Sequence, residues 1–168
     1  GHSQCSFYLV PLDGAALPPF LPGQFITFAV ATADAQASPL VRCYSLSEPP
    51  DPKHYRITVK RTLAPASQPE LPPGQISNHL HDAVQPGDVL KVKAPAGRFV
   101  LDPNPDLPVV LIAGGIGITP LLCMLRWCLA EQPGRRVHLY YGVRSAQDQA
   151  FATLLAELVQ THPAFRLH

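Results

Sequence analysis

Up to about residue 100, short apolar runs alternate with turn residues, a pattern typical of antiparallel β-strands. The runs are rich in β-branched and aromatic side chains, and Pro, Gly and Asp separate them. They predict five strands, over residues 6–10, 24–30, 40–45, 55–60 and 89–93. This spacing indicates an antiparallel Greek-key barrel, with a sandwich as the alternative. One short helix interrupts the strands, with Ser77 as its N-cap and its end near Ala83.

After the barrel pattern, strands and helices alternate. Residues 108–113 form a continuous apolar run, which predicts a strand buried on both faces. An amphipathic helix follows, and its apolar face carries Leu121, Leu122, Leu125 and Leu129. The remaining runs predict a strand over 136–141, a helix over 148–160 and the opening of a third strand at 164–167. This order predicts an α/β unit whose parallel sheet has right-handed crossovers.

A Pro-rich segment at residues 102–106 separates the two patterns. We therefore predict two domains. Residues 1–102 would form the barrel, and residues 106–168 would form the first part of the α/β domain.

Composition narrows the possible functions. Hydrophobic residues make up 46% of the chain and charged residues 15%, which is typical of a globular protein. The formal net charge of +1 gives no electrostatic attraction to nucleic acid, and no apolar run is long enough to predict a membrane span. The four cysteines have no paired spacing, so we expect no zinc or iron–sulfur site within this chain, core positions for Cys123 and Cys128, and a cytoplasmic location.

A glycine-rich turn, residues 114–117, joins the predicted strand at 108–113 to the following helix. The N-terminus of a helix carries unpaired N–H groups and partial positive charge, and glycines let a phosphate approach them closely. Thr119 suits the N-cap and Pro120 the first helical position, so we favour dinucleotide binding over a plain tight turn. Pro120 replaces the third glycine of the usual G-x-G-x-x-G, and no acidic residue closes the next strand. The ordinary dehydrogenase fingerprint is therefore not met.

Two segments of the barrel carry groups suited to a phosphorylated, planar cofactor. Arg42 and Tyr44 share one strand face, where a guanidinium matches phosphate and a tyrosine ring can stack on a flat ring system. Ser45 would point away unless the strand bends. The segment 74–77 supplies a second helix N-terminus, with the Ser77 hydroxyl nearby. Taken alone, the two segments are better explained as an ordinary strand and a simple helix cap.

Taken together, these motifs resemble the ferredoxin–NADP reductase superfamily. The matching motifs are R-x-Y-S at 42–45, a strand ending V-K-R at 59–61, G-x-x-S at 74–77 and G-G-I-G-I-T-P at 114–120. Within the superfamily, the chain is most similar to the reductase half of flavohaemoglobins and of oxygenase reductases.

The resemblance implies that the barrel holds a flavin, with FAD favoured over FMN. Arg42 would bind the flavin phosphate, while Tyr44 would pack on the isoalloxazine or ribityl chain and Ser45 would hydrogen-bond near the flavin N5. Tyr44 and Ser45 are thus the candidate catalytic residues. Backbone contacts would come from Val59 and Lys60, and the FAD pyrophosphate would lie on Gly74, Gln75, Ile76 and Ser77.

The resemblance also implies that NADH or NADPH binds the α/β unit, on Gly115, Gly117, Thr119 and Pro120. The adenosine ribose would lie near Arg144, Asp148 and Phe151. Hydride would pass from the nicotinamide C4 to the flavin N5, and electrons would continue to an iron–sulfur, haem or other acceptor. Only Arg144 is present to recruit a 2′-phosphate, so NADH is the favoured nucleotide.

The sequence departs from the family at both ends. The family's barrel has six strands, and its nicotinamide domain continues for several strands more. We therefore expect this chain to be a fragment of a longer reductase, with a ferredoxin-type 2Fe–2S domain beyond residue 168 as one candidate acceptor. The alternative function is a non-catalytic regulatory subunit that binds flavin or nucleotide. A dehydrogenase without flavin fails on the barrel half and on Pro120.

Overall fold

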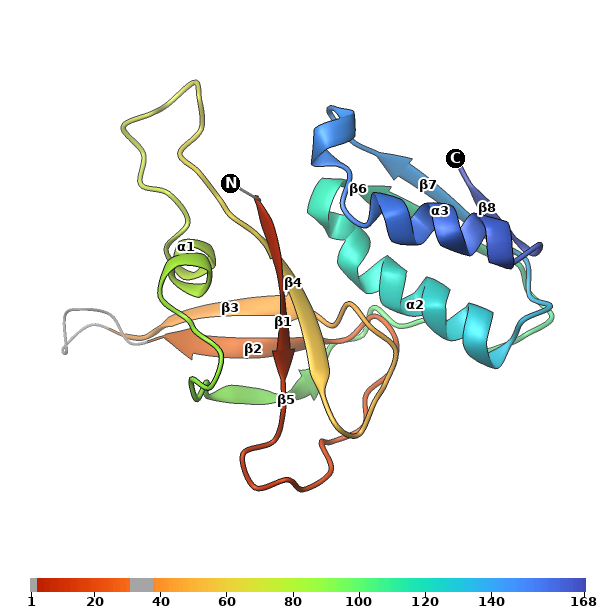
Figure 1. Ribbon diagram of the computed structural model, residues 1–168, viewed down its shortest axis with the longest axis horizontal. Helices are drawn as coiled ribbons and strands as arrows, with labels where there is room; N and C mark the ends of the chain where they lie inside the picture. Colours follow the sequence, from red (N-terminus) through yellow and green to blue (C-terminus); the bar gives the residue numbers. More distant parts are fainter. Residues whose placement is uncertain (1–2, 31–37) are drawn as a thin grey trace.

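The computed structural model describes residues 3–30 and 38–168 of the chain. Within these residues, an antiparallel half precedes a half with a parallel sheet and helices (Figure 1). The first half contains β1 (Gln4–Leu9), β2 (Phe25–Val30), β3 (Leu40–Ser45), β4 (Tyr55–Lys60), α1 (Gln75–Asp82) and β5 (Val92–Ala96). The second contains β6 (Val109–Gly114), α2 (Ile118–Glu131), β7 (Val137–Gly142), α3 (Ala152–Thr161) and β8 (Phe165–Leu167). Short 3-10 turns, η1 (Gly115–Gly117) and η2 (Ala146–Asp148), precede α2 and α3.

The strands of the first half pair antiparallel, as predicted. β1 pairs with β4, while β2 lies between β3 and β5 in a second sheet. An isolated bridge between Leu46 and Ile57 joins the end of β3 to β4. Ile26, Phe28 and Leu80 are fully buried between these sheets and α1 and form part of one core.

The last strand of the barrel lies further along the chain than its composition predicts. The sequence predicts residues 89–93, but β5 spans Val92–Ala96 and Val89 is 65% exposed. Pairing with β2 sets the limits: Val92 opposes Phe28 and Ala96 opposes Phe25, with an irregularity between these pairs. Pro95 lies within that irregularity, where its missing N–H breaks no regular ladder bond.

The second half is a parallel sheet in the order β6-β7-β8, also as predicted. α2 and α3 pack on the same face of this sheet, where Leu111, Leu139, Leu155 and Phe165 form part of a second core.

The prediction that the strand after residue 108 is buried on both faces is wrong. Residues of β6 alternate between buried and exposed, and Val110 and Ile112 are 60% and 76% exposed. Tyr140, which pairs with Ile112 across β7, is 45% exposed. Both described helices cover the opposite face, so these apolar side chains lie on an uncovered face.

Three predicted helix starts also need correction. α1 begins after Gly74 and not at a Ser77 cap, and α2 begins after Gly117, with Thr119 and Pro120 inside its first turn. Pro120 is tolerated there because N–H groups of the first turn have no intrahelical acceptor. α3 begins at Ala152 rather than at residue 148, because Phe151 has a left-handed backbone (φ 60°).

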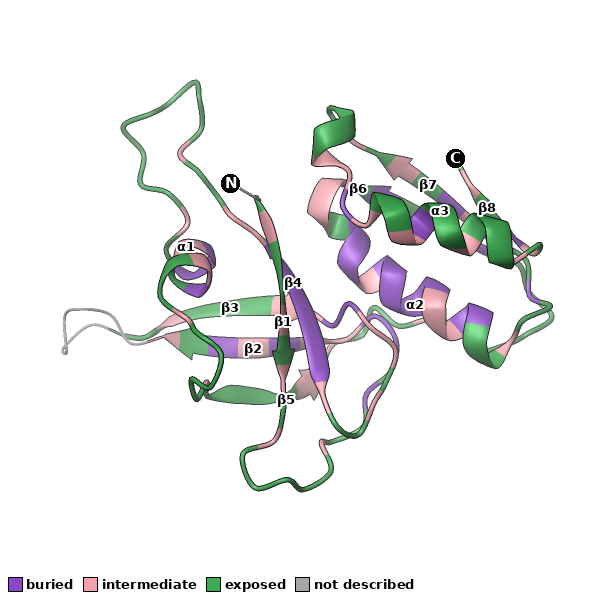
Figure 2. Cartoon of the chain, viewed as in Figure 1, coloured by how far each residue is buried: buried purple, intermediate pink, exposed green. Residues whose placement is uncertain are grey.

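α2 belongs to both halves of the molecule. Most of its buried side chains pack on the parallel sheet, but Cys123 packs in the core of the barrel. Met124 reaches the turn at Gly23, whose φ is +108° and where an added Cβ would lie 2.2 Å from the Phe99 carbonyl oxygen. β4, purple along most of its length in Figure 2, is buried between the barrel core and the second half. The two halves therefore meet at a packed seam.

Cys123 and Cys128 are buried, as predicted, while Cys5 and Cys43 are exposed. In the described residues, no cluster of three or more His, Cys, Asp or Glu side chains could hold a metal ion. None of the helices described is both long and apolar enough to cross a membrane.

Candidate functional site

A cleft of about 760 Å³ lies between the barrel, α1 and the start of α2. Its volume is within the usual range for a pocket that takes a small molecule or cofactor. Most of the predicted site residues line it: Arg42, Tyr44, Ser45, Val59, Lys60, Gly74, Gln75, Ile76, Ser77, Gly117, Thr119 and Pro120. The structure thus places the barrel motifs and the start of α2 around one space, which we call the first cleft.

β3 presents the R-x-Y-S motif along one wall of the first cleft. Arg42 and Tyr44 lie opposite the core residues Phe28 and Ile26 of β2, so they share one face of the strand, as predicted. The Tyr44 ring is half-buried and meets Phe28 edge-on at 5.6 Å, which fixes its orientation. Burial raises the pKa of the Tyr44 phenol, and the charge of Arg42 opposes that shift. Ser45, expected to point away, also lines the cleft at the end of β3.

The start of α1 forms the second wall. No side chain in the described residues caps this helix, and no acidic residue lies in its first turn. The Ser77 hydroxyl instead donates to the Gly74 carbonyl at 3.1 Å and accepts from the Thr62 N–H at 3.2 Å. Ser77 therefore holds the turn at Gly74 in place, and the first N–H groups of α1 remain available to an anion.

The start of α2 closes the first cleft from the other half of the molecule. Again no described side chain caps the helix and its first turn holds no acid; Thr119 donates to the Ile116 carbonyl at 3.2 Å. Gly115 has a left-handed backbone (φ +49°), and a Cβ added at Gly115 or Gly117 would meet nothing within 4 Å. The glycine turn thus leaves open space in front of a helix N-terminus, which suits a phosphate.

A second cleft, of about 800 Å³, adjoins the first. It lies at the carboxyl ends of β6 and β7, where ligands bind in open α/β sheets, and it contains the predicted residues Gly115 and Arg144. Lys60, Thr62 and Ile116 line both clefts. All the predicted flavin residues therefore line the first cleft. The predicted nucleotide residues are split between the clefts: Gly117, Thr119 and Pro120 line the first, and Gly115 and Arg144 line the second.

An ion pair between the two halves lies at that shared wall. The Lys60 ammonium is 2.8 Å from the Asp148 carboxylate, and the Gln4 amide donates to the Asp148 carbonyl at 3.3 Å. The hydrogen bonds from Lys60 and Ser145 hold the pKa of Asp148 below its usual value. The sequence placed Lys60 and Asp148 near different ligands and did not predict their contact.

Tyr141 supports the glycine turn from β7. Its hydroxyl donates to the Gly115 carbonyl at 3.0 Å and accepts from the Ala150 N–H at 3.0 Å. Burial raises the pKa of the Tyr141 phenol above its usual value. Sequence reasoning noted Tyr141 only as part of a strand end and missed this role.

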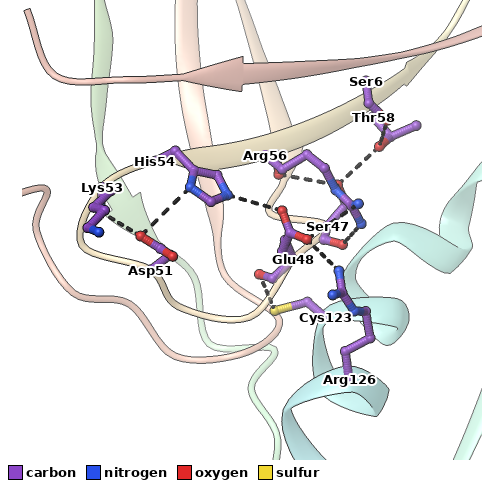
Figure 3. A network of polar contacts seen from close by, with 10 residues as sticks. All are labelled: Ser6, Ser47, Glu48, Asp51, Lys53, His54, Arg56, Thr58, Cys123 and Arg126. Atoms are coloured by element: carbon purple, nitrogen blue, oxygen red, sulfur yellow. Dashed lines mark hydrogen bonds and ion pairs between the residues drawn. The ribbon is translucent and has the colours of Figure 1, made fainter. Parts of the chain in front are cut away.

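A polar network on the seam, drawn in Figure 3, also escaped sequence reasoning. Glu48, between β3 and β4, meets Arg56 of β4 and Arg126 of α2. Arg56 is buried, donates to Ser47, and lies over the Phe151 ring at 5.5 Å. Glu48 and Arg126 are 78 positions apart along the chain, and no local motif predicts their contact.

Comparison with known proteins gives the class. The oxidoreductase FAD-binding domain model matches residues 10–101, and the oxidoreductase NAD-binding domain model matches residues 111–168. The chain therefore belongs to the family of FAD- and NAD-binding oxidoreductases. The predicted superfamily and the predicted cofactor classes are confirmed at this level.

Individual relatives are similar over most of this chain. The flavohemoprotein of Rhodopirellula baltica is 43% identical over 94% of the chain and 38% of its own length. Flavohemoprotein A of Dictyostelium discoideum is 39% identical over 94% of the chain and 40% of its own length. The chain thus spans about two fifths of these curated relatives.

Solved structures show the same fold. The flavohem-like FAD/NAD-binding domain of nitric oxide dioxygenase from Vibrio cholerae has a TM-score of 0.86 and 36% identity, over 99% of this chain and 67% of that one. Phthalate dioxygenase reductase has a TM-score of 0.74 and 32% identity, over 99% of this chain and 47% of that one.

Proposed function

We propose that this chain is the reductase module of an NAD(P)H-dependent flavin oxidoreductase. It would take hydride from NAD(P)H onto FAD and pass electrons to an acceptor. Residues 1–102 would be the FAD domain, and residues 106–168 the first part of the nucleotide domain.

The observation that carries the proposal is the first cleft. Two uncapped helix N-termini, of α1 and α2, open on it together with the Arg42 guanidinium. Neither first turn holds an acidic side chain, so the described donors around this space are matched to phosphate groups. Arg42 and the start of α1 therefore fit the phosphates of FAD, and the start of α2 would face the nucleotide.

Each predicted residue has a role that its place supports. Arg42 would bind the flavin phosphate, and the N–H groups of Gln75, Ile76 and Ser77 would bind the pyrophosphate. Tyr44, held edge-on by Phe28, would pack on the flavin, and Ser45 would hydrogen-bond beside its reactive edge. Val59 and Lys60 would add backbone contacts from β4.

The second cleft would take NAD(P)H. Gly115 and Arg144 line this cleft, with Arg144 toward the adenosine ribose. Gly117, Thr119 and Pro120 would receive the nucleotide from the adjoining first cleft, at the start of α2. The preference for NADH over NADPH stays a prediction from the sequence. When bound, the flavin supplies the hydride-accepting N5 and releases electrons singly or in pairs.

Similar proteins support a proposal for the acceptor. We propose a haem or iron–sulfur domain as the acceptor, since similar proteins include flavohemoproteins and an oxygenase reductase that serves a [2Fe–2S] centre. We also propose a cytoplasmic location.

The test is direct. The protein, purified with added FAD, should be yellow with a stoichiometric flavin, and NADH should bleach it under anaerobic conditions. Protein that neither retains nor takes up FAD would overturn the proposal. Protein that binds FAD but is not reduced by either nucleotide would instead fit the regulatory alternative.

A further inference from the structure

Glu48 joins the two halves through both its side chain and its backbone (Figure 3). Its carboxylate accepts a hydrogen bond from Arg126 of α2 at 2.5 Å and lies 3.6 Å from the Arg56 guanidinium of β4. The other carboxylate oxygen is 3.1 Å from the His54 ring. The Glu48 carbonyl accepts a hydrogen bond from the Cys123 thiol at 3.0 Å. Glu48 thus contacts α2 at two positions about one turn apart.

The surrounding side chains keep the Glu48 carboxylate ionised. Burial alone would raise the pKa of the Glu48 carboxyl, but the hydrogen bonds from Arg126 and His54, with the charge of Arg56, hold it below its usual value. An ionised carboxylate with charged donors makes stronger hydrogen bonds than a neutral pair.

The Glu48 cluster is better shielded than the other ion pair across the seam. Lys60 and Asp148 are about one third exposed, and such pairs contribute little on their own. The side chains of Glu48, Arg56 and Arg126 are 19%, 8% and 30% exposed, so the carboxylate and its partner on β4 are the shielded members of the cluster. Water therefore screens the Glu48 contacts less, and we expect them to set the position of α2.

The contact between Glu48 and Arg126 lies far along α2 from the first cleft. A small tilt of the helix at Arg126 therefore produces a larger displacement at the start of the helix. Arg126 is about 12 Å along the helix axis from Ile118, where α2 starts beside the first cleft. A tilt of about 5° at Arg126 would shift that start by about 1 Å, because displacement grows with distance along the helix. A misplacement of about 1 Å can cost about a hundredfold in rate.

We propose that Glu48 is a positioning residue for hydride transfer: by holding Arg126 and Cys123, it sets the start of α2 against the flavin cleft. The inference rests on the proposed function. It concerns a residue that lines neither cleft and would act through its contacts with α2.

The kinetic test uses Glu48→Gln in the full chain, which keeps the shape and removes the charge. We expect the anaerobic rate of flavin reduction at saturating NADH to fall about tenfold or more, while affinity for FAD changes less than twofold. Arg126→Gln should give the same loss, and the double variant should be no slower than either single one, because both changes remove one contact. Arg126→Lys should restore most of the rate.

Asp51→Asn is the matched control. Asp51 lies in the same loop and is 3.7 Å from the His54 ring, but it makes no contact with α2 among the described residues. This variant removes one negative charge from the loop and should reduce its flavin at the wild-type rate.

A second readout needs no flavin and no turnover. Cys123 lies at the seam, whereas Cys128 lies in the core of the second half. The alkylation rate of Cys123 therefore reports opening of the seam, and that of Cys128 reports opening of the second core. In flavin-free protein, Glu48→Gln should speed alkylation of Cys123 at least fivefold relative to Cys128, and Asp51→Asn should not.

The outcomes separate the two proposals. Wild-type reduction rates in Glu48→Gln, or an equal loss in Asp51→Asn, would overturn the positioning role alone. Parallel increases at Cys123 and Cys128 would also overturn it, because they would indicate general destabilisation. If neither nucleotide reduces the wild-type flavin, the proposed function fails and the positioning role fails with it. Should Glu48→Gln not fold, Arg126→Gln carries the same test.

Discussion

At the scale of single residues, Arg42 is exposed, but its position is set by the strand that carries it. It is anchored on β3, and its guanidinium donates to the Val41 carbonyl at 2.8 Å while lining the first cleft. A guanidinium has five N–H donors, so this contact leaves it able to bind phosphate as well.

We expect Arg42→Ala to weaken FAD binding about 10- to 100-fold, because a charge-assisted hydrogen bond contributes about 1.5–3 kcal/mol. Fluorescence titration of the flavin-free protein with FAD measures the dissociation constant. Arg98→Ala, which removes an exposed arginine of the same half outside both clefts, should leave it unchanged. Equal affinity of Arg42→Ala and wild type would remove Arg42 from the proposed site.

Tyr141 shows how a single hydroxyl can support a ligand turn. Tyr141→Phe would leave both the Gly115 carbonyl and the Ala150 N–H without this partner. We expect a loss of about 1–3 kcal/mol in the free energy of unfolding, the usual cost of stranding a partly buried polar group. Urea unfolding followed by the fluorescence of Trp127, the single tryptophan, measures it.

Tyr140→Phe is the control for this change. The Tyr140 hydroxyl makes no hydrogen bond to the residues that the structure describes, so its loss should alter stability by no more than about 0.5 kcal/mol. If both variants unfold at the same urea concentration as wild type, the two hydrogen bonds of Tyr141 contribute nothing measurable.

At the scale of elements, the predicted strands and helices were found where periodicity defines them. β2, β3 and β4 match their predictions to within a residue, because alternating or β-branched runs bounded by turn residues leave little choice. β5 was displaced because pairing with β2, and not composition, decides which residues join the ladder. The start of α3 was missed because nothing in the sequence marks Phe151 as left-handed.

The docking of α2 on the barrel should depend on pH. Glu48, faced by His54, Arg56 and Arg126, and Asp148, faced by Lys60 and Arg144, both have pKa values below their usual 4.5 and 3.8. A carboxyl whose pKa is lowered by folding stabilises the folded state above its ordinary pKa and loses that contribution as pH falls through the folded value.

We therefore expect the seam to be stable from neutral pH down to about pH 5 and to loosen below about pH 4. The measurement is the urea midpoint between pH 7 and pH 3. In Glu48→Gln, the decrease on acidification should be smaller than in wild type, because one of the titrating groups is gone. An identical decrease in both would show that Glu48 is not coupled to folding.

At the scale of the whole molecule, the sequence predicted the two halves and most residues around the clefts, but not how the halves meet. The R-x-Y-S and glycine-turn motifs are local, so they can be read from the chain. Glu48 and Arg126 each look like an ordinary surface charge in their own segment. Their pairing depends on the angle at which α2 leaves the glycine turn, and no periodicity encodes that angle.

The uncovered face of the parallel sheet should make this chain bind to other apolar surfaces. Val110 and Ile112 form an exposed apolar strip beside Tyr140, and contiguous exposed apolar surface favours association with other apolar surfaces. We expect the protein to be retained on a phenyl resin and to brighten a hydrophobic dye. Ile112→Thr, which keeps a β-branched side chain, should shorten retention without lowering the melting temperature by more than a few degrees. A mild non-ionic detergent should therefore reduce the association of this chain through that face.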